Sequence, residues 1–238
     1  MTVITLEING IAVGVSDGTT IYQAALEAKI YIPTLCHLEG LSPVGACRLC
    51  LVEQIGSSKL LASCCTKVSE GMEILTNTAK LQQYRRMDVE LLFSEGNHIC
   101  AVCVADGACE LQDAALAVGM DHSRFNYRFP DRHVDLSHTM FGIDHNRCIL
   151  CTRCVRVCDE IEGAHVWDVA KRGAQCYIVS GLNQPWGEVD ACTNCGKCVD
   201  ACPTGAIFIK GTTVGLKEAG HQKLDFLIKA REFKQWTR

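Results

Sequence analysis

Two runs of four closely spaced cysteines dominate the second half of the chain. Cys148-x2-Cys151-x2-Cys154-x3-Cys158 recurs as Cys192-x2-Cys195-x2-Cys198-x3-Cys202. Three thiolates in a tight loop can wrap one iron–sulfur cube, while the fourth, on the helix that follows, reaches a second cube. The repeat therefore predicts two [4Fe–4S] clusters with crossed ligands, one held by Cys148, Cys151, Cys154 and Cys202 and the other by Cys158, Cys192, Cys195 and Cys198.

Zinc is the alternative for this repeat. Structural zinc sites are tetrahedral and usually take two C-x2-C pairs separated by a long loop. Four cysteines in one short run, present twice, fit that pattern poorly. Pro203 follows the last cysteine directly, and Gly196 allows the backbone to pass close to a cluster. These features favour iron–sulfur chemistry.

A second constellation lies near the N-terminus, in the order Cys36-x10-Cys47-x2-Cys50-x13-Cys64. Plant-type [2Fe–2S] proteins use a shorter first gap, so the match to them is not complete. Cys64 and Cys65 are neighbours whose side chains point to opposite faces of an extended segment, so we expect only one ligand there and choose Cys64. The alternative is a set of buried structural cysteines.

The third constellation is Cys100-x2-Cys103-x5-Cys109, with His98 just before it. Three cysteines leave one iron of a [4Fe–4S] cluster without a protein ligand. A neutral imidazole can supply that ligand, as histidine does in Rieske centres. The alternative is that His98 is an ordinary surface residue in the turn after Glu95.

These assignments use 15 of the 17 cysteines. Cys65 is left over, and Cys176 is interpreted as a small buried residue in a strand. Each remaining histidine is expected to be solvated or to form an ordinary hydrogen bond, although three of them could form a labile metal patch. These three are His122, His133 and His138.

The elements that must position these residues can be predicted from local patterns. Strands are expected over 2–8 and 11–15, joined by Asn9-Gly10, which tolerates positive φ at both positions. Thr20-x-x-Gln23 resembles a capping box before a helix that ends at Pro33. Further strands are expected around 51–55 and 72–76, and helices over 79–95 and 110–119. The longer helix is expected to bury Leu81, Tyr84, Met87, Leu91 and Leu92.

Composition excludes several classes of protein. The formal charge of −4 gives no basic face for nucleic acid. No apolar run reaches the ~18 residues that span a bilayer. The N-terminal segment lacks a signal-peptide pattern and the cysteine count is odd, so we expect a cytoplasmic protein with thiols rather than disulfides. There is no G-x-G-x-x-G after a strand and no P-loop, so we expect no nucleotide site and no catalytic site in this chain.

The order of the three constellations resembles the N-terminal region of the complex I 75-kDa subunit and of iron-only hydrogenases. It is most similar to the small diaphorase subunit of bidirectional, NAD(P)-linked nickel–iron hydrogenases, the HoxU family, over essentially the whole chain. The segments that carry the likeness are CHLEGLSPVGACRLC (36–50), ASCCTKVSEGM (62–72), CAVCVADGACELQD (100–113), DHNRCILCTRCVRVC (144–158) and CTNCGKCVDACPTGAI (192–207). Thr66 and Gly71-Met72 match the family frame that makes Cys64 the ligand. One departure is Gly96, which stands where the complex I pattern has histidine, whereas His98 lies two residues later.

The resemblance implies an α+β chain. Its parts would be a β-grasp [2Fe–2S] domain (1–78), a helical [4Fe–4S] domain with one histidine and three cysteine ligands (79–119), a linker (120–140), a bacterial-ferredoxin-like domain with two [4Fe–4S] clusters (141–211) and a partner-docking tail (212–238). The implied function is electron relay between a flavin- and NAD(P)-binding diaphorase subunit and the small and large nickel–iron hydrogenase subunits, with a further small [2Fe–2S] subunit as an optional partner.

Two other functions stay open. The chain could serve as the equivalent relay in a formate dehydrogenase or a complex I-like NADH dehydrogenase. It could also be a redox-inactive zinc module that binds other proteins. A brown protein that bleaches on reduction would separate the relay from the zinc module.

Overall fold

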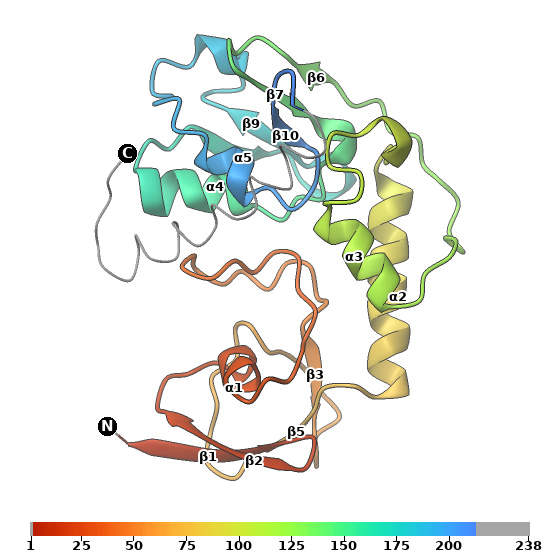
Figure 1. Ribbon diagram of the computed structural model, residues 1–238, viewed down its shortest axis with the longest axis vertical. Coiled ribbons are helices and arrows are strands. Elements are labelled where there is room, and N and C mark those ends of the chain that lie inside the picture. Colours follow the sequence, from red (N-terminus) through yellow and green to blue (C-terminus); the bar gives the residue numbers. More distant parts are fainter. Residues whose placement is uncertain (1, 213–238) are drawn as a thin grey trace. The chain divides into compact units, whose positions relative to one another are not determined.

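The computed structural model describes residues 2–212 of the chain and divides them into two compact units (Figure 1). The first unit comprises residues up to His37, then Pro43–Glu90 and Ala114–Asp121. The second comprises Leu38–Ser42, Leu91–Asp113 and the described chain from His122 onward. No helix within residues 2–212 is long and apolar enough to cross a membrane. The tail predicted to dock a partner falls, from residue 213 on, outside the described residues.

The first unit is built on a five-stranded sheet in the order β2-β1-β5-β3-β4, with β1 and β5 parallel. Asn9 and Gly10 both have positive φ, of 53° and 81°, and join β1 to β2 as predicted. Alternate residues of the hairpin face the core, where Leu6 and Ile8 pack with Val13 and Val15. The strands are β1 (Val3–Ile8), β2 (Ile11–Ser16), β3 (Leu51–Gln54), β4 (Leu60–Ala62) and β5 (Glu73–Leu75).

Helix α1 (Ile21–Glu27) begins at the predicted capping box. The Gln23 backbone N–H donates to the Thr20 hydroxyl at 3.2 Å, and the Thr20 N–H donates to the Gln23 side chain at 3.1 Å. Two donors that a helix start leaves without partners are thereby satisfied. Ala24 and Ala25 are fully buried, so α1 packs closely on the sheet core.

Helix α2 (Ala79–Glu95) has the predicted bounds, but only part of its predicted face is buried. Tyr84 and Leu91 are exposed, whereas Leu81, Arg85 and Val89 are buried. The i, i+4, i+8 spacing of these three puts them on one stripe of the helix. The prediction was wrong for Tyr84 and Leu91. The buried stripe includes the charged Arg85, whose guanidinium donates to two backbone carbonyls.

The second unit holds helix segments, a three-stranded sheet β10-β7-β6 and the hairpin β8-β9. The sequence predicted a linker over 120–140, yet Val134–Asp135 forms strand β6 and pairs with β7. The bounds are α3 (Glu110–Ala117, whose second half belongs to the first unit), β6 (Val134–Asp135), β7 (Phe141–Asp144), α4 (Arg153–Arg156), a π-helical continuation (Val157–Glu162), β8 (Trp167–Ala170), β9 (Tyr177–Ser180), α5 (Lys197–Ala201) and β10 (Ile207–Ile209).

The cysteine repeat has a matching repeat in the backbone. Leu150 and Asn194 occupy equivalent positions and have φ of 53° and 60°. Thr152 and Gly196, which cap α4 and α5, have φ of 58° and 75°. A left-handed backbone conformation is unfavourable for residues other than glycine. Its recurrence at equivalent positions shows that the two loops share one backbone conformation.

Candidate iron–sulfur centres

The four cysteines predicted for the first crossed set line one cavity of about 340 Å³. Cys148, Cys151 and Cys154 come from the loop before α4 and its first turn, and Cys202 follows α5. Burial raises the pKa of Cys151 to about 12, with electrostatic repulsion from Cys202 adding to it. Burial likewise raises the pKa of Cys148 to about 11. Such thiols give up their protons when a metal replaces them.

The second crossed set lines a separate cavity of about 320 Å³. Cys158 lies in the π-helical segment, and the other three cysteines (Cys192, Cys195 and Cys198) lie before and in α5. Two indoles and a backbone amide reach these sulfurs. Trp186 Nε1 donates to Cys192 Sγ at 3.4 Å, the Trp167 side chain hydrogen-bonds Cys198, and the Val166 N–H donates to Cys158 Sγ at 3.3 Å. Hydrogen bonds to sulfur tune cluster potentials.

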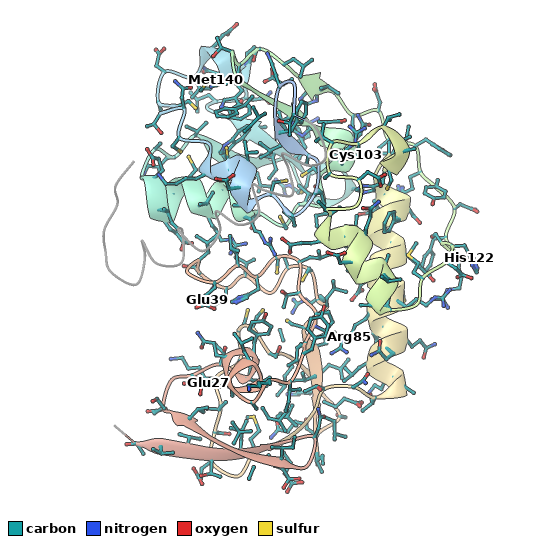
Figure 2. The ribbon with its side chains drawn as sticks, in the orientation of Figure 1. Glu27, Glu39, Arg85, Cys103, His122 and Met140 are labelled. Carbon is teal, nitrogen blue, oxygen red and sulfur yellow. The ribbon has the colours of Figure 1, made fainter. Side chains whose placement is uncertain are left out.

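His98 and its three cysteines line a third cavity, of about 300 Å³. Figure 2 shows Cys103 in the loop that follows α2, and Cys100 and Cys109 belong to the same loop. Burial raises the pKa of Cys109 to about 11, with repulsion from Cys103 and Cys202 contributing. All four predicted side chains therefore face one space.

The His98 ring is in its neutral form. The ring donates a hydrogen bond to the Leu92 backbone, while its Nε2 is buried without a hydrogen-bond partner. The donating atom is therefore Nδ1, which leaves a lone pair on Nε2. Burial lowers the pKa of His98 to about 4. A neutral imidazole fixed by a backbone carbonyl is the usual arrangement of a metal-binding histidine.

Two glycines leave room for side chains of this set. A Cβ atom on Gly96 would overlap His98 Nε2, and a Cβ on Gly205 would overlap Cys103 Sγ. Gly96 is the position at which the complex I pattern carries its histidine. Because the residue there has no side chain, the His98 ring can occupy that space. His98 therefore packs against Gly96 while its ring lines the cavity with the three cysteines.

The N-terminal constellation forms two close sulfur pairs in the first unit. The Cys50 and Cys64 sulfurs lie 3.3 Å apart, and the Cys47 N–H donates to Cys36 Sγ at 3.5 Å. The hydrogen bond between Cys50 and Cys64 lowers the pKa of Cys50 to about 6, whereas electrostatic repulsion from Cys36 opposes that shift. The structure therefore brings all four predicted cysteines together.

The two leftover cysteines lie outside these cavities. Cys65 is exposed, with its sulfur 3.5 Å from that of Cys64. Cys176 is half-buried beside β9, rather than buried within a strand as predicted.

The histidines of the possible metal patch do not converge. His122 and His133 are exposed, whereas His138 is buried between Phe141 and Trp186. His138 accepts the N–H groups of Met140 and Phe141 on Nδ1, so its Nε2 donates to Asn194 Oδ1 at 2.7 Å. His138 is therefore a hydrogen-bonding residue of the second crossed site.

The predicted ligands line their cavities without meeting at one point. Among residues 2–212, no three His, Cys, Asp or Glu side chains converge closely enough to hold a single metal ion. A tetrahedral zinc site requires such convergence, whereas an iron–sulfur cluster spreads its ligands around a larger body. Each of the three cavities is lined by one complete predicted set of four ligands.

Several residues that contact the sites gave no signal in the sequence. Trp186 donates to Cys192, and His138 hydrogen-bonds Asn194 in the loop of the second crossed set. Arg85 donates to the backbone carbonyl of Leu49, the residue before Cys50. A bidentate pair of Arg153 and Glu110 joins the His98 loop to α4. Each contact joins residues from different segments of the chain, so no local motif marks it.

Three family models match successive parts of the chain. One described as a 2Fe-2S iron-sulfur cluster binding domain matches residues 1–79. The NADH-ubiquinone oxidoreductase-G iron-sulfur binding region matches residues 85–124, and the ferredoxin-like domain of NADH-quinone oxidoreductase subunit 3 matches residues 139–208. The chain is therefore a mixed α and β protein with both 2Fe-2S and 4Fe-4S binding regions.

Individual relatives include hydrogenase subunits and longer oxidoreductase subunits. The chain is 35% identical to the gamma subunit of the NAD-reducing hydrogenase HoxS of Cupriavidus necator, over 87% of both chains. It is 37% identical to the NADPH-Fe(3+) oxidoreductase subunit alpha of Geobacter sulfurreducens and 35% identical to the NADP-reducing hydrogenase subunit HndD of Solidesulfovibrio fructosivorans, but spans only 24% and 36% of their lengths. A chain in the crystal structure of an NAD+-reducing [NiFe]-hydrogenase superposes with a TM-score of 0.83 at 34% identity, over 88% of both chains.

Proposed function

The chain belongs to the family of the gamma subunit of NAD-reducing hydrogenase, and from this premise we propose that it relays electrons within a hydrogenase complex. Its partners would be a flavin- and NAD(P)-binding diaphorase subunit on one side and a nickel–iron hydrogenase module on the other. The observation that carries the proposal is the set of three cavities, each lined by one predicted set of four ligands.

The proposed ligands follow from these cavities and from the sulfur pairs of the first unit. When bound, an iron–sulfur cluster takes up and releases single electrons. A [2Fe–2S] cluster would be held by Cys36, Cys47, Cys50 and Cys64. Three [4Fe–4S] clusters would be held by His98 with Cys100, Cys103 and Cys109, by Cys148, Cys151 and Cys154 with Cys202, and by Cys158 with Cys192, Cys195 and Cys198. The chain itself supplies ligands and hydrogen bonds, and the bond chemistry belongs to its partners.

A short connection joins two of the proposed sites in the second unit. The Glu110 N–H donates to the Pro203 carbonyl oxygen at 2.9 Å, which links the residue after Cys109 to the residue after Cys202. Gly205 lies against Cys103 without a side chain between them. Thr204 lines both cavities, so the His98 site and the Cys148 site are neighbours, which supports electron transfer between them.

The proposed domain division follows the same sites. The [2Fe–2S] domain would occupy 1–78, the His98 site 79–119 and the two-cluster domain 141–211, with 120–140 as a connecting segment and 212–238 as the docking tail. The family models match nearly the same three cluster-bearing ranges, which supports this division.

The crossed ligands provide the direct test. Cys148→Ser and Cys202→Ser should each remove the same [4Fe–4S] signal from low-temperature EPR spectra of the reduced, anaerobically reconstituted chain. Cys192→Ser should remove a different signal and leave the first intact. Loss of different clusters in Cys148→Ser and Cys202→Ser would contradict the crossed arrangement. A wild-type chain without iron and acid-labile sulfide would contradict the relay itself.

A second candidate is the same relay in a complex I-like NADH dehydrogenase, since two of the family models carry the names of NADH dehydrogenases that reduce quinones. Metal analysis of the purified complex separates the two. Nickel in a partner subunit supports the hydrogenase, whereas a nickel-free complex that reduces quinone supports the alternative.

A further inference from the structure

Arg85 is a buried cation in the first unit. Arg85 is 2% exposed, and its side chain extends from α2 toward β3 (Figure 2). Its Nε donates to the Leu49 carbonyl oxygen at 2.9 Å, and its Nη2 donates to the Leu51 carbonyl oxygen at 2.9 Å. These two carbonyls belong to the residues on either side of Cys50, so the guanidinium is fixed beside a proposed ligand of the [2Fe–2S] cluster.

The charge of Arg85 has no carboxylate partner among residues 2–212. Two other arginines near proposed ligands do have one, since Arg147 pairs with Asp144 and Arg153 pairs with Glu110. An arginine stays protonated in proteins, and a buried charge without a counter-charge is strongly unfavourable. Burial lowers the pKa of Arg85, and negative charge on Cys50 offsets that effect. The negative charge that compensates Arg85 therefore comes from the cysteine site.

We infer that Arg85 is the fixed counter-charge of the [2Fe–2S] cluster and sets its reduction potential. This inference rests on the proposed function, because it requires the cluster to be present. Four thiolates and two sulfides outweigh the charge of two irons, and reduction adds one further negative charge. A nearby cation therefore stabilises the reduced cluster more than the oxidised one. Arg85 is a positioning residue for the cluster's electrostatics and does not itself accept electrons.

The test compares three variants of the full chain, anaerobically reconstituted. Arg85→Gln keeps hydrogen-bond donors near the two carbonyls but removes the charge, whereas Arg85→Lys keeps the charge. Lys80→Gln is the matched control, because Lys80 also lies on α2 but is exposed and pairs with Glu53. The readouts are [2Fe–2S] content, from iron and sulfide quantitation and EPR spin counts, and the midpoint potential of that signal in a dye-mediated titration.

Arg85→Gln should hold the cluster and make it about tenfold harder to reduce, a downward shift of about 59 mV for one electron. Arg85→Lys should stay within about threefold of the wild type because it keeps the charge, and Lys80→Gln should match the wild type. An unchanged or raised potential in Arg85→Gln would overturn the inference. If Arg85→Gln loses the cluster, Arg85→Lys decides: a bound cluster near the wild-type potential supports the counter-charge, and a lost or strongly shifted cluster overturns it.

This result is separable from the proposed function. A wild-type chain that binds no [2Fe–2S] cluster would defeat the proposed function before any variant is made. A wild-type chain with a normal cluster, together with an Arg85→Gln cluster of the same potential, would defeat only the role of Arg85.

Discussion

Glu110 and Arg153 form a bidentate ion pair in the second unit, with Nη1 and Nη2 of the arginine 2.6 and 2.7 Å from the two carboxylate oxygens. Glu110 directly follows Cys109, and Arg153 directly precedes Cys154. The pair therefore fastens the loop of the His98 site to the helix of the Cys148 site. The Arg153 side chain is only 3% exposed, so its charge depends on this partner.

Glu110→Gln should destabilise the protein by about 3 kcal/mol, because it removes the carboxylate that compensates the buried Arg153 charge. For a chain of this size the loss corresponds to a fall of roughly 6 to 12 °C in the midpoint of thermal unfolding followed by circular dichroism. Glu53→Gln is the control, since Glu53 pairs with the exposed Lys80 and should give a smaller change. Equal midpoints for the two variants would show that the buried pair adds nothing to stability.

Local patterns in the sequence predicted those elements that depend on neighbours in the chain. The capping box of Thr20 and Gln23, the Asn9-Gly10 turn and the bounds of α2 are all set by residues a few positions apart. The cysteine spacings likewise identified the groups that gather around each cavity, because the ligand loops are short.

The contacts that surround these groups could not be predicted in the same way. Arg85 is buried because carbonyls 34 and 36 residues away accept its hydrogen bonds. The imidazole of His138 reaches Asn194, 56 residues along the chain. Strand β6 depends on pairing with β7 rather than on its own two residues. Such long-range satisfaction of polar groups overrides local preference, which is why α2 buries a charged residue and a segment predicted as linker contains a strand.

Gly96→Ala should damage the His98 site specifically. The backbone at residue 96 is not left-handed, so alanine brings no backbone strain, but its Cβ would overlap His98 Nε2. The ring would have to turn out of the cavity, and we expect iron and sulfide to fall by one [4Fe–4S] equivalent, or one EPR signal to change shape. Gly14→Ala is the control, because a Cβ there meets Val3 at an ordinary 3.5 Å. Full cluster content with unchanged spectra in Gly96→Ala would argue against His98 as a ligand.

Acid should weaken the fold through His145. His145 is 5% exposed, and burial lowers its pKa to about 4. Repulsion of its protonated form by His133 and Arg132 lowers the pKa further. The unfolded chain, with a pKa near the usual ~6.5, therefore binds a proton that the folded chain does not. Stability falls as pH drops below about 6.5, and the loss between pH ~7.5 and ~5.5 is roughly 1 kcal/mol.

The measurement for His145 is thermal unfolding of the wild type and His145→Gln at several pH values across that same interval. The variant should be less dependent on pH by the amount attributed to this histidine. The same substitution at the exposed His122 controls for the loss of a histidine as such. Parallel pH profiles for the wild type and His145→Gln would refute the assignment.

Trp186→Phe should lower the reduction potential of one [4Fe–4S] cluster. The indole is 1% exposed and packs against Phe141 and Trp167, with ring centroids 5.4 and 4.6 Å away, so a phenyl ring can keep much of this packing. What is lost is the N–H donor to Cys192 Sγ at 3.4 Å. Donors to the sulfurs stabilise the more negative, reduced cluster, and one hydrogen bond is worth on the order of 1 kcal/mol, or roughly 40 mV for one electron.

The shift is measured by EPR-monitored potentiometry of the reconstituted chain. It should be confined to the cluster that Cys192→Ser removes, and the cluster that Cys148→Ser removes should titrate as in the wild type. Trp167→Phe provides the parallel case, because the Trp167 side chain hydrogen-bonds Cys198 in the same site. If both variants leave every midpoint unchanged while retaining their clusters, the two indoles only fill space. If either variant instead shifts the potential of the cluster that Cys148→Ser removes, the assignment of Cys192 and Cys198 to a separate cluster is wrong.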